Sequence, residues 1–185
     1  MLTWIIIAAI VLIAGMFFLY YNRFVRLVNQ IENSLAQIDV QLRKRGDLIP
    51  NLVKSVKGYM KHESKIITKV TDARKALLAA DKKGDMKGKL KAGNEMQTAL
   101  KSIFAIAENY PDLKANQNFL HLQQEMSAIE DKIAYSRQYY NDGIMSYNTS
   151  TTTIPGKWFA SLYSFAKKEY LQIPQESKAV PKLDF

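Results

Sequence analysis

The hydrophobic and polar positions of the chain form one uniformly apolar stretch followed by several amphipathic ones. Residues 2–21 hold no charged side chain, and every Lys, Arg, Asp and Glu lies after them. A hydrocarbon core about 30 Å thick is crossed by about 20 helical residues, and a helix satisfies its own backbone hydrogen bonds in lipid. No basic leader or small-residue cleavage site accompanies the stretch. It therefore predicts an uncleaved transmembrane anchor over residues 1–22, rather than a cut signal peptide or a buried soluble helix.

Aromatic and basic residues follow the apolar stretch. Tyr20 and Tyr21 stand where an interfacial aromatic belt is expected, and Arg23 and Arg26 come directly after them. No basic side chain precedes the stretch, so the positive-inside bias predicts an outer N-terminus and a cytoplasmic bulk. These four residues are candidates for contact with the membrane interface.

A seam of apolar residues with alternating spacings of four and three begins soon after the anchor. Only Arg45 and Glu63 interrupt it. Its apolar members are Ile31, Leu35, Ile38, Leu42, Ile49, Leu52, Val56, Tyr59, Ile66, Val70, Ala73, Leu77 and Ala80. This spacing predicts a long helical stripe buried against other helices. Residues 21–30 contain no Gly, Pro or Ser, so we expect the anchor helix to continue into the seam.

Gly46, Asp47 and Pro50 stand within the seam. Gly46 could end one helix and Asp47 could cap the next, which would place Pro50 in a first turn. A single helix kinked at Pro50 is the other interpretation. Because the seam keeps its phase, a kink or tight restart is favoured over a reversal of the chain.

The second half of the chain predicts further helices. Residues 81–92 carry five lysines and two glycines and suggest an exposed loop, followed by a helix over residues 94–109. Asp112 or Asn116 could cap the next helix, which runs to about Tyr147. Its apolar stripe comprises Phe119, Leu122, Met126, Ile129, Ile133, Tyr140, Ile144 and Tyr147.

The last segments are short. The tract Thr149–Thr153 and then Pro155–Gly156 end the long helix, an amphipathic helix is expected over residues 157–170, and residues 171–185 suggest an extended tail. No segment resembles a strand. The sequence predicts an all-α protein whose transmembrane helix (1–22) continues into an elongated antiparallel bundle over residues 23–170.

Composition narrows the possible functions. The formal net charge of +9 lies wholly after the anchor, which indicates either attraction to an anionic leaflet or simple solubility. Cysteine is absent, and this excludes disulfides, thiolate zinc sites and cysteine nucleophiles. The lysines of the expected loop lack interleaved aromatic residues, so we expect no nucleic-acid partner.

Three long stretches of the sequence can be compared with known families: QIDVQLRKRGDLIPNLVKSVKGYMKHE at Gln37–Glu63, AENYPDLKANQNFLHLQQEMSAIEDKIAYSRQYYND at Ala107–Asp142 and SYNTSTTTIPGKWFASLYSF at Ser146–Phe165. In this order they resemble the LemA family. The resemblance implies a single-span helical-bundle protein of the bacterial cytoplasmic membrane, with its N-terminus outside. It implies no activity, because the family has no established chemistry. Some relatives are associated with organising internal membranes.

Charged and amide side chains within these stretches are the candidate polar positions. They are Arg45, Asp47, Asn51, Glu63, Asn116, Glu130 and Arg137. Charges inside a bundle need partners, so structural pairing between helices is the first interpretation and an oligomer interface the second. His62 and His121 do not have the spacing of a zinc motif, and we expect no metal, no cofactor and no catalytic residue.

Trp158 and Phe159 have two open interpretations. They cap the bundle, or they lie in the headgroup region as part of an interfacial helix.

Two functional hypotheses follow from these features. The first is a structural protein that self-associates as a homo-oligomer and scaffolds the membrane, because tethering raises the local concentration. The alternative is a signalling or adaptor module that presents its bundle to an unknown protein partner. An enzyme is not expected.

Overall fold

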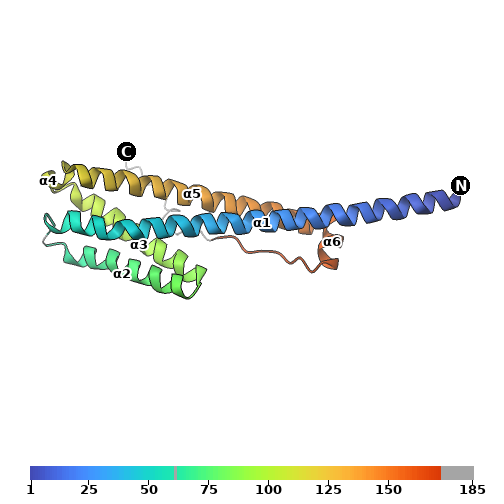
Figure 1. Ribbon diagram of the computed structural model, residues 1–185, viewed down its shortest axis with the longest axis horizontal. Coiled ribbons are helices and arrows are strands. Elements are labelled where there is room, and N and C mark those ends of the chain that lie inside the picture. Colours follow the sequence, from blue (N-terminus) through green and yellow to red (C-terminus); the bar gives the residue numbers. More distant parts are fainter. Residues whose placement is uncertain (61, 172–185) are drawn as a thin grey trace, which may run out of the picture. The chain divides into compact units, whose positions relative to one another are not determined.

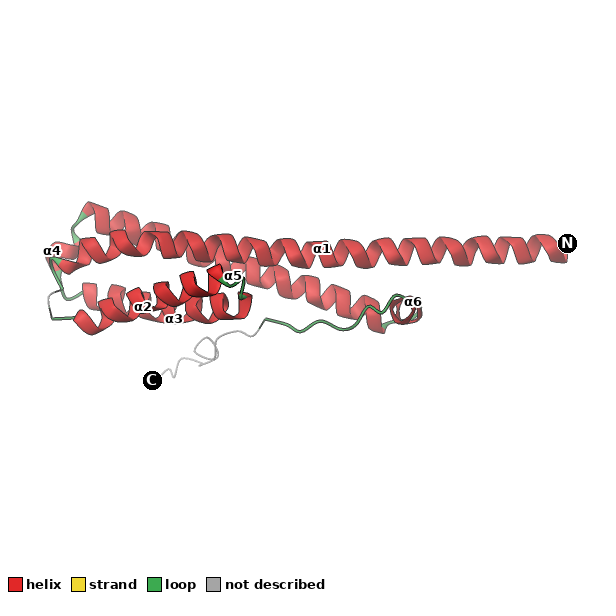
Figure 2. Ribbon diagram, turned by 60° about the horizontal axis from the view of Figure 1, so that its bottom comes forward, coloured by secondary structure: helices red, strands yellow, loops and turns green. Residues whose placement is uncertain are grey.

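The structure is a computed structural model that describes residues 1–60 and 62–171. Six helices account for most of them: α1 (Leu2–Lys57), α2 (Ser64–Lys82), α3 (Met86–Ala107), α4 (Pro111–Lys114), α5 (Gln117–Thr152) and α6 (Gly156–Leu162) (Figure 1). These residues contain no strand (Figure 2). The all-α prediction is confirmed. The expected tail at 171–185 lies outside the described residues except for Leu171.

The described residues pack into two compact units. The terminal unit comprises residues 1–36 and 136–171, and the central unit comprises residues 37–60 and 62–135. Helices α1 and α5 contribute residues to both units. Each unit has its own buried interior.

Helix α1 passes through Gly46 and Pro50 without ending. Proline has no N–H to donate to the carbonyl four residues earlier, which here belongs to Gly46. Arg74 of α2 replaces that donor: its Nε–H donates to the Gly46 carbonyl oxygen at 2.9 Å. A Cβ at Gly46 would lie 3.1 Å from a methyl group of Leu77, so the missing side chain also lets α2 approach. The expectation that the chain does not reverse at Gly46–Pro50 is confirmed, and the helix neither ends nor restarts there.

The seam does not form one helix as far as Ala80, so that part of the prediction is wrong. Helix α1 ends at Lys57 and α2 begins at Ser64, with Glu63 at its N-cap position. Buried seam residues occur on both helices, from Leu42 and Leu52 on α1 to Val70 and Leu77 on α2. Two helices that share one interior keep the same spacing, so the periodicity could not reveal the turn between them.

The exposed loop expected at residues 81–92 is also incorrect. Helix α2 continues to Lys82, and α3 begins at Met86 with Asp85 as its N-cap. The Asp85 carboxylate accepts a hydrogen bond from the Gly88 backbone N–H at 2.9 Å, which satisfies one of the free donors of the first turn. The lysine content suggested solvent exposure, but Lys89 lies on the buried face of α3.

Lys89 is the centre of an ionic cluster in the central unit. Its Nζ lies 2.6 Å from Asp39 of α1 and 3.0 Å from Asp81 of α2, and Arg43 bridges the same two carboxylates at 3.0 and 2.8 Å. Burial opposes the charge of Lys89, but the hydrogen bonds to Asp39 and Asp81 outweigh it, so the pKa of Lys89 is raised. The Lys89 hydrogen bond lowers the pKa of Asp81. The cluster therefore joins α1, α2 and α3.

The terminal unit is built where α1 packs against α5 and α6. Ile31, Ile144 and Tyr147 form one buried cluster, and Phe24, Phe159 and Ala160 form another. Helix α5 extends past Tyr147 to Thr152, and hydroxyl groups of its last two turns donate to carbonyls three or four residues earlier. The Ser/Thr tract is thus accommodated inside the helix.

Helix α6 is shorter than the helix expected at residues 157–170. It ends at Leu162, and Ser164 adopts a φ of 58°. The Phe165 N–H donates to the Ala160 carbonyl at 2.9 Å and the Ser164 N–H to Ser161 at 3.3 Å, which is the Schellman arrangement. Glycine usually occupies the left-handed position of this motif, so a serine there gave no signal for the helix end.

The Lys89 cluster gives a pH-dependent prediction. We expect Lys89→Met to lower the free energy of unfolding at neutral pH by roughly 2 kcal/mol, because two carboxylates lose a buried charged donor. Because the pKa of Lys89 is raised in the folded state, its full contribution to the free energy of unfolding is present below its unfolded-state pKa of about 10.4. That contribution is lost as the pH rises through the folded-state pKa. The contribution of Asp81 to the free energy of unfolding is fully present above its unfolded-state pKa of about 3.9. It is lost as the pH falls through the lowered pKa of the folded state.

Urea unfolding of the full chain in detergent, followed by circular dichroism, measures this effect. The difference in the free energy of unfolding between the parent protein and Lys89→Met should be constant around neutral pH. It should shrink once the pH exceeds the pKa of lysine in the unfolded state. Lys87→Met is the matched control, because Lys87 is exposed on the same helix. Equal losses in the two variants would contradict the prediction.

Candidate functional site

Arg45 is the most deeply buried charged residue of the central unit. It lies on α1 with 1% exposure, and its Nη2 forms an ion pair with the Glu130 carboxylate of α5. Its Nη1 donates to the Gly93 carbonyl of α3 at 3.3 Å. Gln97, also on α3, donates to the other oxygen of Glu130. One guanidinium therefore links three helices.

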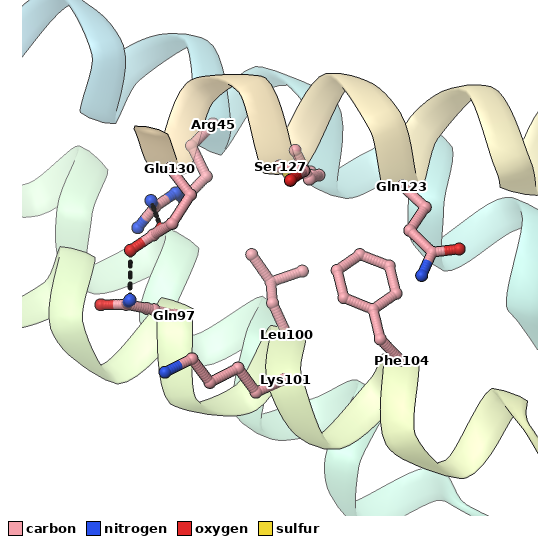
Figure 3. A pocket seen from close by; sticks show the side chains of 9 residues that line it. Arg45, Gln97, Leu100, Lys101, Phe104, Gln123, Ser127 and Glu130 are labelled. Atoms are coloured by element: carbon pink, nitrogen blue, oxygen red, sulfur yellow. Dashed lines mark hydrogen bonds and ion pairs between the residues drawn. The ribbon is translucent and has the colours of Figure 1, made fainter. Parts of the chain in front are cut away.

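These groups border a cavity of about 220 Å³. Figure 3 shows Arg45 and Gln97 directed at Glu130, with Leu100 and Phe104 on the side away from the ion pair. Its full lining is Arg45, Gln97, Leu100, Lys101, Phe104, Gln123, Met126, Ser127 and Glu130. Because Arg45 and Glu130 already satisfy each other, the arrangement serves to position helices and shows no activated nucleophile.

The remaining candidate polar residues are placed separately. Asp47 and Asn51 are exposed on α1, and Glu63 precedes α2 without a side-chain cap. Asn116 caps α5: its Oδ1 accepts from the N–H groups of residues 118 and 119 at 3.0 and 3.2 Å. Its amide also donates to the Tyr59 hydroxyl at 3.3 Å. Of these candidates, the structure brings only Arg45 and Glu130 into a shared cluster among the described residues of the central unit.

Arg137 belongs to the terminal unit, where it is half-buried on α5. The Arg137 side chain is not without a partner in this structure. The two histidines are exposed, and the described residues contain no group of His, Cys, Asp and Glu side chains suited to a metal ion.

An aromatic junction joins α6 to α1 in the terminal unit. The Phe159 ring centroid lies 4.8 Å from that of Phe17, edge to face, and 4.8 Å from that of Tyr20, stacked. Tyr163 lies 5.1 Å from Tyr21, and Phe165 lies 5.0 Å from Phe24. Phe17, Tyr20 and Tyr21 close the apolar run of α1. We call this cluster the aromatic junction.

Before the residues of the aromatic junction, the apolar run is left uncovered by the rest of the described protein. Helix α1 contains a window of mean hydropathy 2.7 with none of its residues buried, which by length and composition can cross a membrane. Arg23 and Arg26 are exposed directly after it. Trp158 is 64% exposed, whereas Phe159 is 8% exposed and faces α1. Of the two neighbouring aromatic candidates, Phe159 is therefore buried in the junction and Trp158 is turned outward.

Two asparagines of α5 bind the segment that follows α6. Asn148 accepts from the Lys168 N–H and donates to the Lys168 carbonyl, both at 2.9 Å. Asn141 makes the same pair of bonds with Leu171 at 3.0 and 3.3 Å. Between them, the Tyr147 hydroxyl donates to the Ala166 carbonyl at 3.0 Å. Burial raises the pKa of Tyr147, which favours the protonated donor form.

Sequence reasoning missed Asn141, Asn148 and Lys89. The two asparagines are seven residues apart, so they lie on one face of a helix, and that spacing is the signal that could have found them. Polar residues between apolar stripes are usually solvated, so their spacing carried little weight. For Lys89, the charge of the surrounding lysines concealed its position on the buried face of α3.

The Arg45–Glu130 pair gives a prediction for the free energy of unfolding. We expect Glu130→Gln to lower it by about 2–3 kcal/mol, because the buried guanidinium loses its counter-charge while Glu130 itself is partly solvated. Arg45→Met should also destabilise the protein, but the double variant should lose at least about 1 kcal/mol less than the sum of the single losses.

Urea unfolding of the full chain in detergent completes this double-mutant cycle. Asp131→Asn is the matched control, because Asp131 is an exposed carboxylate next to Glu130 on α5. Strict additivity of the two substitutions would refute the pairing.

Comparison with known proteins gives several similar relatives, including the following three. Magnetosome protein MamQ of Magnetospirillum gryphiswaldense is 25% identical over 173 residues, which cover 81% of this chain and 64% of that protein. Magnetosome protein MamQ 1 of Paramagnetospirillum magneticum is 25% identical over 175 residues, which cover 82% of this chain and 64% of that protein. Protein LemA of Metamycoplasma hominis is 29% identical over 148 residues, which cover 77% of this chain and 66% of that protein. The chain thus spans less than two thirds of the length of these relatives.

The family comparison covers more of the chain. The model of the LemA family matches residues 34–185, which include the aromatic residues of α6, both asparagines and the Arg45–Glu130 pair. The resemblance of the three sequence stretches is thereby confirmed, and the chain belongs to the LemA family.

Proposed function

We propose that this protein is a single-pass scaffold of the bacterial cytoplasmic membrane that self-associates and performs no catalysis. One observation carries the proposal: the aromatic junction packs folded parts of the chain directly against the last turns of the apolar run. Phe159 contacts Phe17 and Tyr20, and Phe24 is completely buried one turn further along α1. A flexible tether would need no such contacts.

The junction supports a mechanical role for the anchor. Helix α1 has no linker between its apolar run and Phe24, and packed aromatic rings resist bending at that point. Movement of the residues packed at the junction is therefore transmitted to the span. Anchored copies are also confined to two dimensions, which raises their effective concentration and favours weak lateral contacts.

The relatives support a role without catalysis. MamQ is named as a magnetosome protein and LemA by its family, and neither name designates an enzyme. The charged residues of the central interior are used in ion pairs between helices: Arg45 with Glu130, and Lys89 with Asp39 and Asp81. These pairs stabilise packing and leave Arg45 and Lys89 committed to structure.

The proposed sidedness places the N-terminal end outside, and the part of the terminal unit after the span, together with the central unit, in the cytoplasm. Arg23 and Arg26 directly follow the span, and the positive-inside bias favours the cytoplasmic side for a flank that carries basic residues. Because the chain lacks cysteine, single-cysteine variants report sidedness without background.

Cysteine labelling of intact cells tests this sidedness. We expect a membrane-impermeant maleimide to label Leu2→Cys in intact cells, and Ser64→Cys, at the exposed start of α2, only after lysis. Labelling of Ser64→Cys in intact cells would place the folded units outside and overturn the topology.

Self-association is tested on protein extracted together with its native lipids. We expect assemblies of several copies at micromolar concentration, because confinement favours lateral contacts. Native mass spectrometry of the extracted particles counts the copies. Particles that contain only monomers would contradict the proposed scaffold function. An unrelated protein present in stoichiometric amount in each particle would favour the adaptor function instead.

A further inference from the structure

The aromatic junction fixes the level of α6 along the apolar run. Phe159 touches Phe17 and Tyr20, and Tyr163 touches Tyr21. A helical residue advances about 1.5 Å, so the four steps from Phe17 to Tyr21 cover about 6 Å and end about 3 Å before Arg23. When residues 2–21 cross a bilayer, side chains in contact with these rings lie where acyl chains meet headgroups.

The direction of α6 fits this level. In both ribbon views α6 lies across α1 and does not run alongside it (Figures 1 and 2). A short helix that crosses a membrane-spanning helix lies close to the plane of the membrane, which is the orientation of interfacial amphipathic helices.

The side of α6 turned away from the junction is also apolar. Trp158 is 64% and Leu162 62% exposed, and Ile154 in the preceding turn is 70% exposed. The opposite side, with Phe159 and Ala160, is already buried against α1. The three exposed side chains are therefore not needed for the junction, and in water they would leave apolar area uncovered.

Basic residues accompany this apolar surface. Arg23, Arg26, Lys157 and Lys167 are exposed, and Lys168 is half-buried. No Asp or Glu occurs in residues 1–31 or 143–168. This part of the terminal unit thus carries only positive side-chain charges, which attract anionic headgroups.

We propose that α6 and the turn before it form a second membrane contact that binds phospholipid. Ile154, Trp158 and Leu162 enter the boundary between headgroups and acyl chains, in the leaflet on the side of the folded units. Lysine and arginine side chains around them select anionic headgroups. The indole of Trp158 suits this depth, because it has an apolar body and one polar N–H.

This contact rests on the membrane anchor of the proposed function and deepens it. The span occupies both leaflets equally, whereas α6 adds area to one leaflet only. Binding of this kind responds to lipid composition and curvature, so the contact would make the scaffold sensitive to the shape of the membrane.

Tryptophan fluorescence gives a direct test, because the chain has only Trp4 and Trp158. The Trp4→Phe variant of the full chain, reconstituted in vesicles, leaves Trp158 as the sole reporter. We expect lipids brominated near the headgroup end of the acyl chain to lower its emission at least about twofold more than lipids brominated near the methyl end, because indole prefers the interface.

The matched variant Trp158→Phe leaves Trp4 within the span. Quenching of Trp4 by brominated lipid together with an unquenched Trp158 would refute the second contact while leaving the anchor intact. Loss of lipid quenching for both residues would instead refute the anchor. An emission of Trp158 that is blue-shifted yet insensitive to brominated lipid would show a protein neighbour and overturn the proposal.

Headgroup selection is tested with brominated lipid as a minor component of the vesicle. We expect brominated anionic phospholipid to quench Trp158 at least about twofold more than its zwitterionic counterpart, because cationic side chains enrich it locally. The double variant Lys157→Gln, Lys167→Gln should lose this preference, and Lys132→Gln, exposed on α5 in the central unit, should keep it. Equal quenching by the two lipids in the parent protein would refute the selection.

Discussion

The packing of Phe159 against Phe17 and Tyr20 is the contact on which the membrane-related features of the structure depend. Burying a phenylalanine side chain contributes about 2–3 kcal/mol, and each aromatic pair adds about 1 kcal/mol. The contact also requires Gly156: a Cβ there would lie 2.1 Å from the Ser150 carbonyl oxygen and 3.3 Å from the Tyr20 ring. Any larger residue would collide with backbone, which cannot give way as a side chain can.

Polar side chains play the corresponding part in the central unit. Apolar side chains alone allow neighbouring helices to shift by one repeat at a small cost in free energy. A buried charge fixes the register, because it meets its partner of opposite charge in only one alignment of the helices. Arg45 links α1 to α3 and α5, Lys89 links α3 to α1 and α2, and Arg74 supplies the donor that Pro50 removes from α1. These interactions connect residues far apart in sequence, which is why helix propensity and periodicity could not pair them.

The sequence predicted burial better than it predicted turns. Ile38, Leu42 and Val70 were expected in the interior and are buried, because apolar spacing reports directly on which face leaves water. The reversal between α1 and α2 and the helical state of residues 86–92 were missed. Spacing is unchanged by a reversal around a shared interior, and the lysine content hid the single buried amine of Lys89.

The segment after α6 explains how so short a helix holds its place. Seven helical residues rise about 10.5 Å, and three extended residues cover about 10 Å, so Asn141 and Asn148 match the spacing of Leu171 and Lys168. A helix of seven residues is marginal by itself in water. Here α6 is held on both sides: the close approach of Gly156 fixes its start, and the asparagine bonds together with the Phe165 contact to Phe24 fix the chain that leaves it. The position of Trp158 is therefore set by the terminal unit and does not depend on the intrinsic stability of α6.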